Sequence, residues 1–449
     1  MRYTTDMTTG SEFGHIIRFA LPMLAGNLFQ QFYNIADSVI VGRFLGADAL
    51  ASVGATGSIT YFFYTLCIGL ATGTGILISQ SFGAGSHENV KKYISNSAYV
   101  LGIFGIVISI LSALAAPYLL KMLNTPPEIF EAATGYMRIS CIGTIAVAAY
   151  NWINSVMRSL GDSKTPLIFL VVASVLNIGL DLLFVVVYEM GVNGAAWATI
   201  IAQAVSAIGS IIFAFAKNPM FRLTKEHARL DSRYAGKCVS TGVPIALQNA
   251  MVSVSMIYLQ SVANTFGKTV VAAYTATMRV EQLIHQPFSS INAAISAFTG
   301  QNVGAGKKER VVTGYKASMK AGTIFALALL VVFLLFSGQI VGLFVDEAEV
   351  IEIGAAALKI SACFYVFLGM IHVTRGLLNG AGDVKYALIN GIAEVAGRIG
   401  FAILLVNIPG TGYFAVWGTT CLTWLLTGIM SYARYKGGSW ERKADNIQI

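Results

Sequence analysis

The sequence predicts an all-α membrane protein with twelve transmembrane helices, arranged as two six-helix bundles that are related by a parallel internal repeat. Composition is the first reason. Of the 449 residues, 55% are hydrophobic and only 12% are charged, and the mean hydropathy is +0.68. So few charged residues cannot cover a water-facing surface of this size. The apolar segments are continuous and do not alternate with period two, which argues against a β-barrel.

Twelve apolar segments follow one another along the chain, and most reach the roughly 20 residues that a bilayer crossing requires. We expect spans at 16–42, 50–80, 94–120, 130–156, 166–188, 192–216, 238–266, 270–300, 317–345, 350–374, 385–408 and 412–433. The first span is too long for a removable signal and has no small-residue cleavage site. We therefore expect the N-terminus to be retained.

The net charge of +8 indicates the orientation of these spans. Lysine and arginine gather at both termini and in the even-numbered connections, whereas the odd-numbered ones contain only Arg43, Lys121 and Lys268. By the positive-inside rule both termini are cytoplasmic, and no nucleic-acid partner is expected. The five cysteines form no CxxC pair and lie in or beside apolar spans, so neither a disulfide framework nor a metal site is indicated.

An internal repeat divides the chain at its one long polar interruption. SQSFGAG at 79–85 matches TGQNVGAG at 299–306, SLGDSK at 159–164 matches GAGDVK at 380–385, and Trp197 matches Trp417, all at a shift near 221 residues. Three matches at one shift indicate a duplication. We expect an N-lobe (1–216), a cytoplasmic linker (217–237) and a C-lobe (238–449). An even number of helices in each lobe makes the copies parallel, with a cavity between lobes that opens to either face when they rock.

Two acids, Asp37 and Asp181, lie inside predicted spans with no lysine, arginine or histidine within a helical turn or two in the interior of the same helix. A carboxylate in hydrocarbon costs at least a few kcal/mol, so each needs a partner, a water-filled cavity or a function. Both spans run outward, and each acid precedes the outer end by a similar length, so the two lie at similar depth. Asn177, Tyr33 and Thr199 fall near them.

The second half of the chain lacks this pair, because the repeat aligns Asp37 with about Leu259 and Asp181 with Ala402. A purely structural requirement would be met in both copies, so we interpret the pair as a cation-handling site. Burial and a second carboxylate both disfavour charge on an aspartate, which suits proton uptake. An ionised pair beside oxygen donors suits Na⁺ instead. Both ions stay open, and no other metal and no cofactor is expected.

Other polar residues inside the spans have local explanations. Glu394 and Arg398 are spaced i, i+4 and can neutralise one another. Span 270–300 contains a cluster of polar residues: Arg279, Glu281 and His285. This cluster is interpreted as a charge pairing, a gate or the lining of a cavity.

Three further patterns concern the helices themselves. Pro22 removes one hydrogen bond inside the first span and is a candidate hinge, with a static kink as the alternative. GLATG at 69–73 and GLLNG at 376–380 have the GxxxG spacing, which most often marks close helix packing. The sequence contains no HExxH, GxSxG or Walker A motif, so no enzyme activity is expected.

Several motifs resemble those of the multidrug and toxic compound extrusion family, MATE: LPMLAGNLFQQFYNIADSVIVGRFLGADALASVG at 21–54, the paired FGAG and VGAG loops, and RSLGDSKTP at 158–166. The resemblance covers essentially the whole chain, and the acids are similar to those of the DinF-like branch. It implies a V-shaped pair of bundles that exports cationic or amphipathic organic compounds in exchange for H⁺ or Na⁺. The implied coupling residues are Asp37, Asn177, Asp181, Thr199, Tyr33 and Asn154.

The resemblance also bears on the substrate and on the second lobe. The NorM-like branch has acids on helices 7 and 10, which this chain lacks, and Gln248 stands near the helix 7 position. Expected substrate contacts are Gln30, Tyr33, Met256, Arg279, Glu281 and His285.

We therefore expect a monomeric multidrug antiporter in the plasma (inner) membrane of a prokaryote, with membrane lipid and small organic compounds as partners. One alternative is a flippase of the same superfamily for a lipid-linked oligosaccharide or another lipid. Such a protein lines its cavity with several basic residues, and candidates here are few: Arg138, Arg279 and Arg398. A passive channel is the second alternative.

Overall fold

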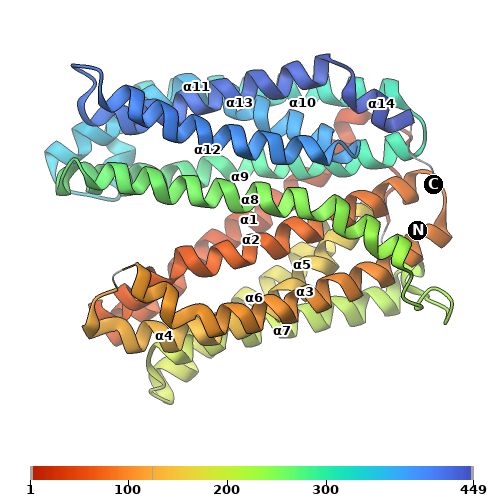
Figure 1. The fold of residues 1–449 in the computed structure, drawn as a ribbon, viewed down its shortest axis with the longest axis horizontal. Coiled ribbons are helices and arrows are strands. Elements are labelled where there is room, and N and C mark those ends of the chain that lie inside the picture. Colours follow the sequence, from red (N-terminus) through yellow and green to blue (C-terminus); the bar gives the residue numbers. More distant parts are fainter. Residues whose placement is uncertain (1–3, 124, 446–449) are drawn as a thin grey trace. The chain divides into compact units, whose positions relative to one another are not determined.

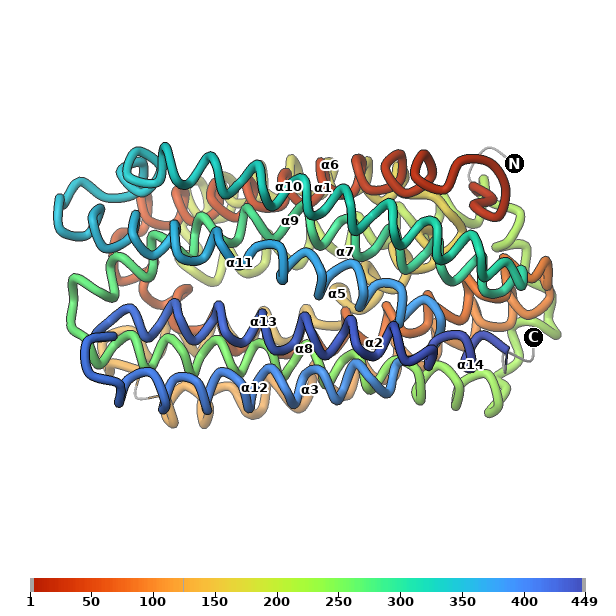
Figure 2. The backbone as a smooth tube through the Cα atoms, turned by 90° about the horizontal axis from the view of Figure 1, so that it is seen from above, coloured from red at the N-terminus to blue at the C-terminus, as the bar shows by residue number. Residues whose placement is uncertain are grey.

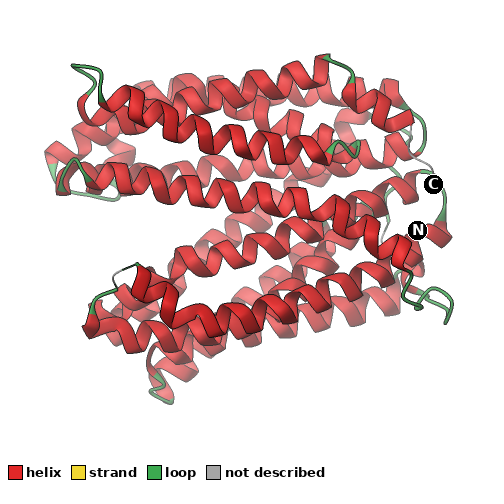
Figure 3. Ribbon diagram, viewed as in Figure 1, coloured by secondary structure: helices red, strands yellow, loops and turns green. Residues whose placement is uncertain are grey.

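The computed structural model describes residues 4–123 and 125–445, and every regular element within them is helical (Figure 3). The helices labelled in Figure 1 are α1 Glu12–Leu45, α2 Ala47–Gly83, α3 His87–Met122, α4 Pro127–Ile142, α5 Thr144–Ser159, α6 Lys164–Asp181, α7 Gly191–Lys217, α8 Ser232–Asn264, α9 Lys268–Gly304, α10 Lys308–Gly342, α11 Ala348–Gly380, α12 Val384–Val406, α13 Ala415–Lys436 and α14 Ser439–Asp445. A π-helix, η1 Leu182–Val187, and two 3₁₀ turns, η2 Pro219–Phe221 and η3 Gly412–Phe414, complete the set. The all-α prediction is confirmed.

The chain forms two compact units. Unit 1 comprises residues 4–6 and Leu21–Ala250, and unit 2 comprises Met7–Ala20 and 251–445. The chain therefore passes from one unit to the other between Asp6 and Met7 and again inside two helices, α1 and α8. In the segment 217–237 the chain leaves α7, forms η2 and enters α8, all within unit 1.

Glycine turns repeat in the two halves at a constant shift of 221 residues. The pairs with positive φ are Gly46 and Gly267, Gly85 and Gly306, Gly161 and Gly382, and Gly191 and Gly412. Gly85 has φ 72° and Gly306 has φ 71°, in the left-handed region that favours glycine. Gly85 N donates to Phe82 O and Gly306 N to Val303 O, both at 3.0 Å. The duplicated sequence thus folds into the same turn twice.

The number of helices is consistent with the twelve predicted spans. Within the described residues, nine helices are long and apolar enough to cross a membrane, or ten if α4 and α5 form one bent span. The helices α1 and α9 are not among these, because their asparagine, glutamine, serine and threonine side chains lower the hydropathy. These two helices carry Asp37 and Glu281, whereas Asp181 lies at the end of α6, in a segment that is apolar enough to cross a membrane.

The predicted span 130–156 is not one straight helix. α4 and α5 meet at Gly143 with a bend of 40°. A Cβ at Gly143 would lie 2.3 Å from Cγ1 of Ile200 on α7, so only glycine allows α7 to approach this closely. The bend thus coincides with a contact to another helix, which hydrophobic periodicity does not predict.

Both GxxxG motifs lie at close helix crossings, as predicted. On α2, a Cβ at Gly69 would lie 2.3 Å from the Cα of Ala246, and one at Gly73 would lie 2.3 Å from the Cα of Gly242, both on α8. On α11, a Cβ at Gly376 would lie 2.3 Å from a side-chain carbon of Ile295 on α9. The small residues let these backbones touch.

Large apolar side chains point outward as well as inward. Exposed ones line α3 and α10, among them Ile110, Leu111, Leu334 and Leu335. This arrangement suits helices that face lipid. Inside unit 2, α11 packs along both α9 and α10, and α12 runs beside α13 (Figure 2).

Candidate functional site

The predicted carboxyl pair forms inside unit 1. Asp37 lies on α1 and is half-buried, whereas Asp181 is the last residue of α6 and is fully buried. The two carboxyl groups contact one another. Oδ1 of each carboxyl group is buried without a partner. Within the described residues, neither acid forms a salt bridge with a lysine, arginine or histidine.

Asn177 and Thr199 hold Asp181 from α6 and α7. Asn177 lies one helical turn before Asp181 and is buried. With its amide oriented to satisfy its neighbours, Asn177 Nδ2 donates to Asp181 Oδ2 at 2.8 Å, and its Oδ1 accepts from Thr199 N at 3.1 Å and from Thr199 Oγ1 at 3.3 Å. The reverse orientation would place the amide oxygen against a carboxylate, which is unfavourable. The amide therefore presents its donor to the acid.

Tyrosine hydroxyls surround the pair. Tyr33, one turn before Asp37 on α1, lies near Thr199 and near both carboxyl groups. Tyr136 on α4 also lies near both acids and Tyr33. The sequence prediction did not include Tyr136, since a single tyrosine in an apolar helix carries no signal of its neighbours.

The backbone changes immediately after Asp181. The α-helix α6 ends there and continues as the π-helix η1, and Tyr188 N donates to Leu183 O at 2.9 Å. Single π-turns inside α-helices frequently occur at functional sites. Periodicity does not predict this turn, because the side chains of residues 182–187 are uniformly apolar.

Pro22 lies inside α1, which is continuous from Glu12 to Leu45. The missing N–H removes the hydrogen bond to the carbonyl of Arg18. The boundary between the units falls after Ala20, two residues before the proline. The weak point of α1 therefore lies where the chain passes from unit 2 to unit 1.

The other predicted residues are more scattered. Asn154 lies on α5 and is buried, with its Oδ1 unpartnered and Tyr150 nearby. It lies five residues before the end of α5, about 8 Å along the helix, whereas Asp181 lies about 26 Å along α6 from Lys164. Asn154 is thus at a different level from the carboxyl pair. Gln30 is exposed on α1, and Met256 is half-buried on α8 in unit 2.

Unit 2 contains a second group of polar side chains. Arg398 is fully buried, donates to Glu394 Oε1 at 3.0 Å and to Ser255 Oγ at 2.6 Å, and so forms the predicted pair. Arg375 donates to Glu394 Oε2 at 3.5 Å. The Glu394 carboxylate therefore accepts hydrogen bonds from two guanidinium groups.

Of the residues predicted to cluster in span 270–300, Glu281 and His285 share one face of α9 and both lie near Arg398, whereas Arg279 does not. Glu281 is buried, contacts Ser361 and lies near Arg398. The His285 ring centroid lies 5.8 Å from that of His372. Arg279 is exposed, because it lies two residues before Glu281 and so points away from it.

Comparisons with known proteins place this chain in one family. The MatE family model matches residues 22–183 and 244–404, one segment in each half. A probable multidrug resistance protein of Bacillus subtilis, YpnP, is 29% identical over 446 residues, with 97% of each chain covered. Another from that bacterium, YoeA, is 25% identical, with 95% of this chain and 93% of that protein covered.

A solved structure agrees with this relationship. An outward-facing multidrug resistance MATE family transporter is 26% identical and superposes with a TM-score of 0.91, over 98% of this chain and 99% of that one. The fold, the repeat and the matches extend over nearly the whole chain. The protein therefore belongs to the MatE family of multi-pass multidrug efflux transporters, MATE.

Proposed function

We propose that the protein is a secondary antiporter that exports cationic or amphipathic organic compounds across a prokaryotic plasma membrane in exchange for protons, with both termini cytoplasmic. The contact between Asp37 and Asp181 carries the proposal. Two carboxylates that touch in a buried site repel one another when both are ionised, and no basic side chain among the described residues pairs with them. A bound cation must therefore neutralise the pair at some stage.

The orientation of Asn177 supports a proton over Na⁺. A hard metal cation is held by several oxygen atoms. When the amide is turned so that Nδ2 donates to Asp181, its oxygen faces Thr199 and does not join the carboxyl oxygens. A proton needs only the two carboxyl groups, which already contact one another.

Antiport follows because the proton and the cationic compound compete for the same negative charge on the carboxyl pair. In the proton-bound state the carboxyl groups share a proton and hold α1 against α6. When the proton leaves, the pair carries the charge that attracts a cationic compound, and repulsion favours another arrangement of α1. Gln30 and Tyr33, on α1 before Asp37, are the proposed cargo contacts in unit 1. Pro22 supplies the weak point at which α1 bends.

The experiment is transport of ethidium, an organic cation, by the purified chain in lipid vesicles with an imposed pH gradient or Na⁺ gradient. Asp37→Asn and Asp181→Asn should each abolish transport driven by the pH gradient. The matched control is Asp48→Asn, an exposed acid on α2, which should transport like the wild type. Size-exclusion elution checks that each variant folds.

Each other outcome has a distinct meaning. Undiminished pH-driven transport by a folded Asp37→Asn protein would refute the proposal. Transport driven by the Na⁺ gradient alone would show that Na⁺ is the coupling ion in place of H⁺. The proposed site at Asp37 and Asp181 would still stand. Ion current without counter-transport would identify a channel, and movement of a lipid-linked sugar without ethidium transport would identify a flippase.

A further inference from the structure

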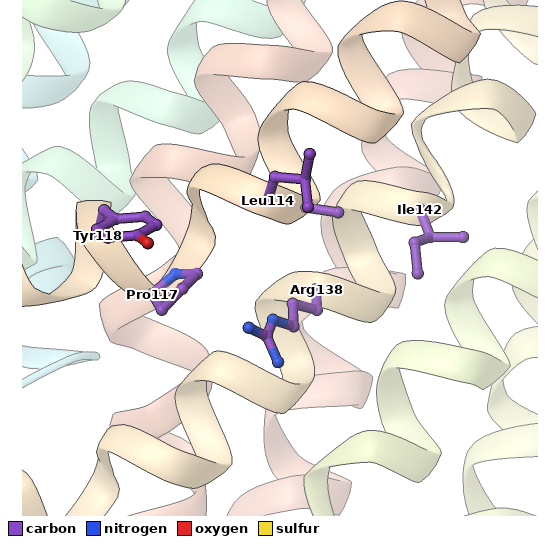
Figure 4. Close-up of a pocket in the computed structure, with 6 residues that line it drawn as sticks. Leu114, Pro117, Tyr118, Arg138 and Ile142 are labelled. Carbon is purple, nitrogen blue, oxygen red and sulfur yellow. The ribbon is translucent and has the colours of Figure 1, made fainter.

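A groove lies between α3 and α4 in unit 1, away from the carboxyl pair (Figure 4). It measures about 500 Å³ and is lined by Ala113, Leu114, Pro117, Tyr118, Arg138 and Ile142. Leu114 and Tyr118 are 67% and 76% exposed. Arg138 is the charged residue of this lining, and the walls beside it are apolar or aromatic.

The groove lies in the outer half of the membrane if the termini are cytoplasmic. α3 then ends outside at Met122. Ser109 Oγ donates to Ile142 O at 2.8 Å, which fixes how the antiparallel helices are aligned. Arg138 therefore starts near the level of Ala113, about 13 Å below Met122. Figure 4 shows its guanidinium group directed toward Pro117, hence toward the outer surface, as expected for an arginine that reaches out of the hydrocarbon.

The charge of Arg138 is not neutralised within the described part of the chain. Its side chain is exposed and forms no salt bridge with a described residue. A guanidinium group beside lipid is unfavourable unless an anion accompanies it. Its planar set of donors matches a phosphate group, with which it forms two parallel hydrogen bonds.

We propose that this groove binds an anionic phospholipid of the outer leaflet. Arg138 holds the phosphate, and an acyl chain lies along Leu114 and Ile142. Tyr118 lies at the outer end of the groove, at the level where tyrosines meet headgroups. This site is independent of cargo and coupling ion, and its failure would leave the proposed antiport unaffected.

The position of the groove gives the lipid a structural consequence. Arg138 lies two residues after Tyr136, so their side chains leave α4 on opposite sides. Tyr136 faces the carboxyl pair, and α4 ends at the bend beside Gly143. A lipid bound at Arg138 would therefore brace the short helix that carries Tyr136.

The test is titration of the purified full chain in detergent with dioleoylphosphatidylglycerol, and with dioleoylphosphatidylcholine as the lipid without net charge, followed by native mass spectrometry. Arg138→Gln should weaken binding of the anionic lipid about five- to tenfold and leave the neutral lipid unchanged. Arg138→Lys should retain most of the preference. Arg43→Gln removes an exposed arginine at the end of α1 and should change nothing.

Leu114→Trp tests the groove itself, because the larger side chain fills the groove and leaves the charge of Arg138 unchanged. This variant should also weaken binding of the anionic lipid. Equal affinity of wild type and Arg138→Gln for phosphatidylglycerol would overturn the proposal, as would equal wild-type affinity for the two lipids. Unchanged binding of the neutral lipid shows that a variant remains folded.

Discussion

The crossing of α2 and α8 in unit 1 allows a prediction of stability. A Cβ at Gly73 would lie 2.3 Å from the Cα and 2.6 Å from the N of Gly242. Both are backbone atoms, so no side-chain rotation relieves the clash and the helices must separate. Overpacking costs about 1–3 kcal/mol for small additions. Gly73→Val adds three carbon atoms, so we expect a loss of about 3 kcal/mol, the upper end of that range.

The matched control for this prediction is Gly102→Val on α3. A Cβ at Gly102 would meet no atom within 4 Å, so its stability should change by less than about 0.5 kcal/mol. Thermal unfolding in detergent measures both variants. A loss of about 3 kcal/mol lowers the Tm by roughly 6–12 °C for a unit of this size. If Gly73→Val unfolds at the wild-type temperature, the backbones of α2 and α8 are not in contact and the reasoning fails.

Three further predictions concern coupling, the second unit and the hinge. Exchange of one proton for one monovalent cation moves no net charge, so a pH gradient of one unit should sustain about a tenfold ethidium gradient. Accumulation driven by membrane potential alone in vesicles would contradict that stoichiometry. Glu394→Gln leaves Arg398 and Arg375 without their carboxylate and should destabilise the protein by about 3–5 kcal/mol. The loss is measured as a lower Tm. A wild-type Tm would show that the Glu394–Arg398 pair is dispensable for stability. Pro22→Ala restores a hydrogen bond in α1 and should slow transport without weakening ethidium binding, whereas a wild-type rate would identify a static kink.

The helical class was predictable because hydrophobicity acts over short stretches of chain. A segment of about 20 apolar residues must form a helix in lipid whatever its neighbours are, and all twelve expected helices have counterparts. The glycine turns at Gly85 and Gly306 are local in the same sense, since their backbone conformation depends on a few residues. Asp37 and Asp181 were conspicuous because a charge inside an apolar helix is rare.

Only the tertiary structure decides what surrounds those acids. Whether Asp181 meets Asp37, and whether Tyr136 joins them, depends on how each helix is rotated about its axis and where it bends. Those quantities are set by contacts between distant segments, such as Gly143 against Ile200, and not by the residues next to each acid. Arg138 illustrates the same limit. Its sequence position is compatible with a cavity inside the lobe, and packing of α4 against α3 leaves it exposed in the groove between these helices. Hydrophobic patterns are properties of single helices, whereas a site is a property of how several helices pack.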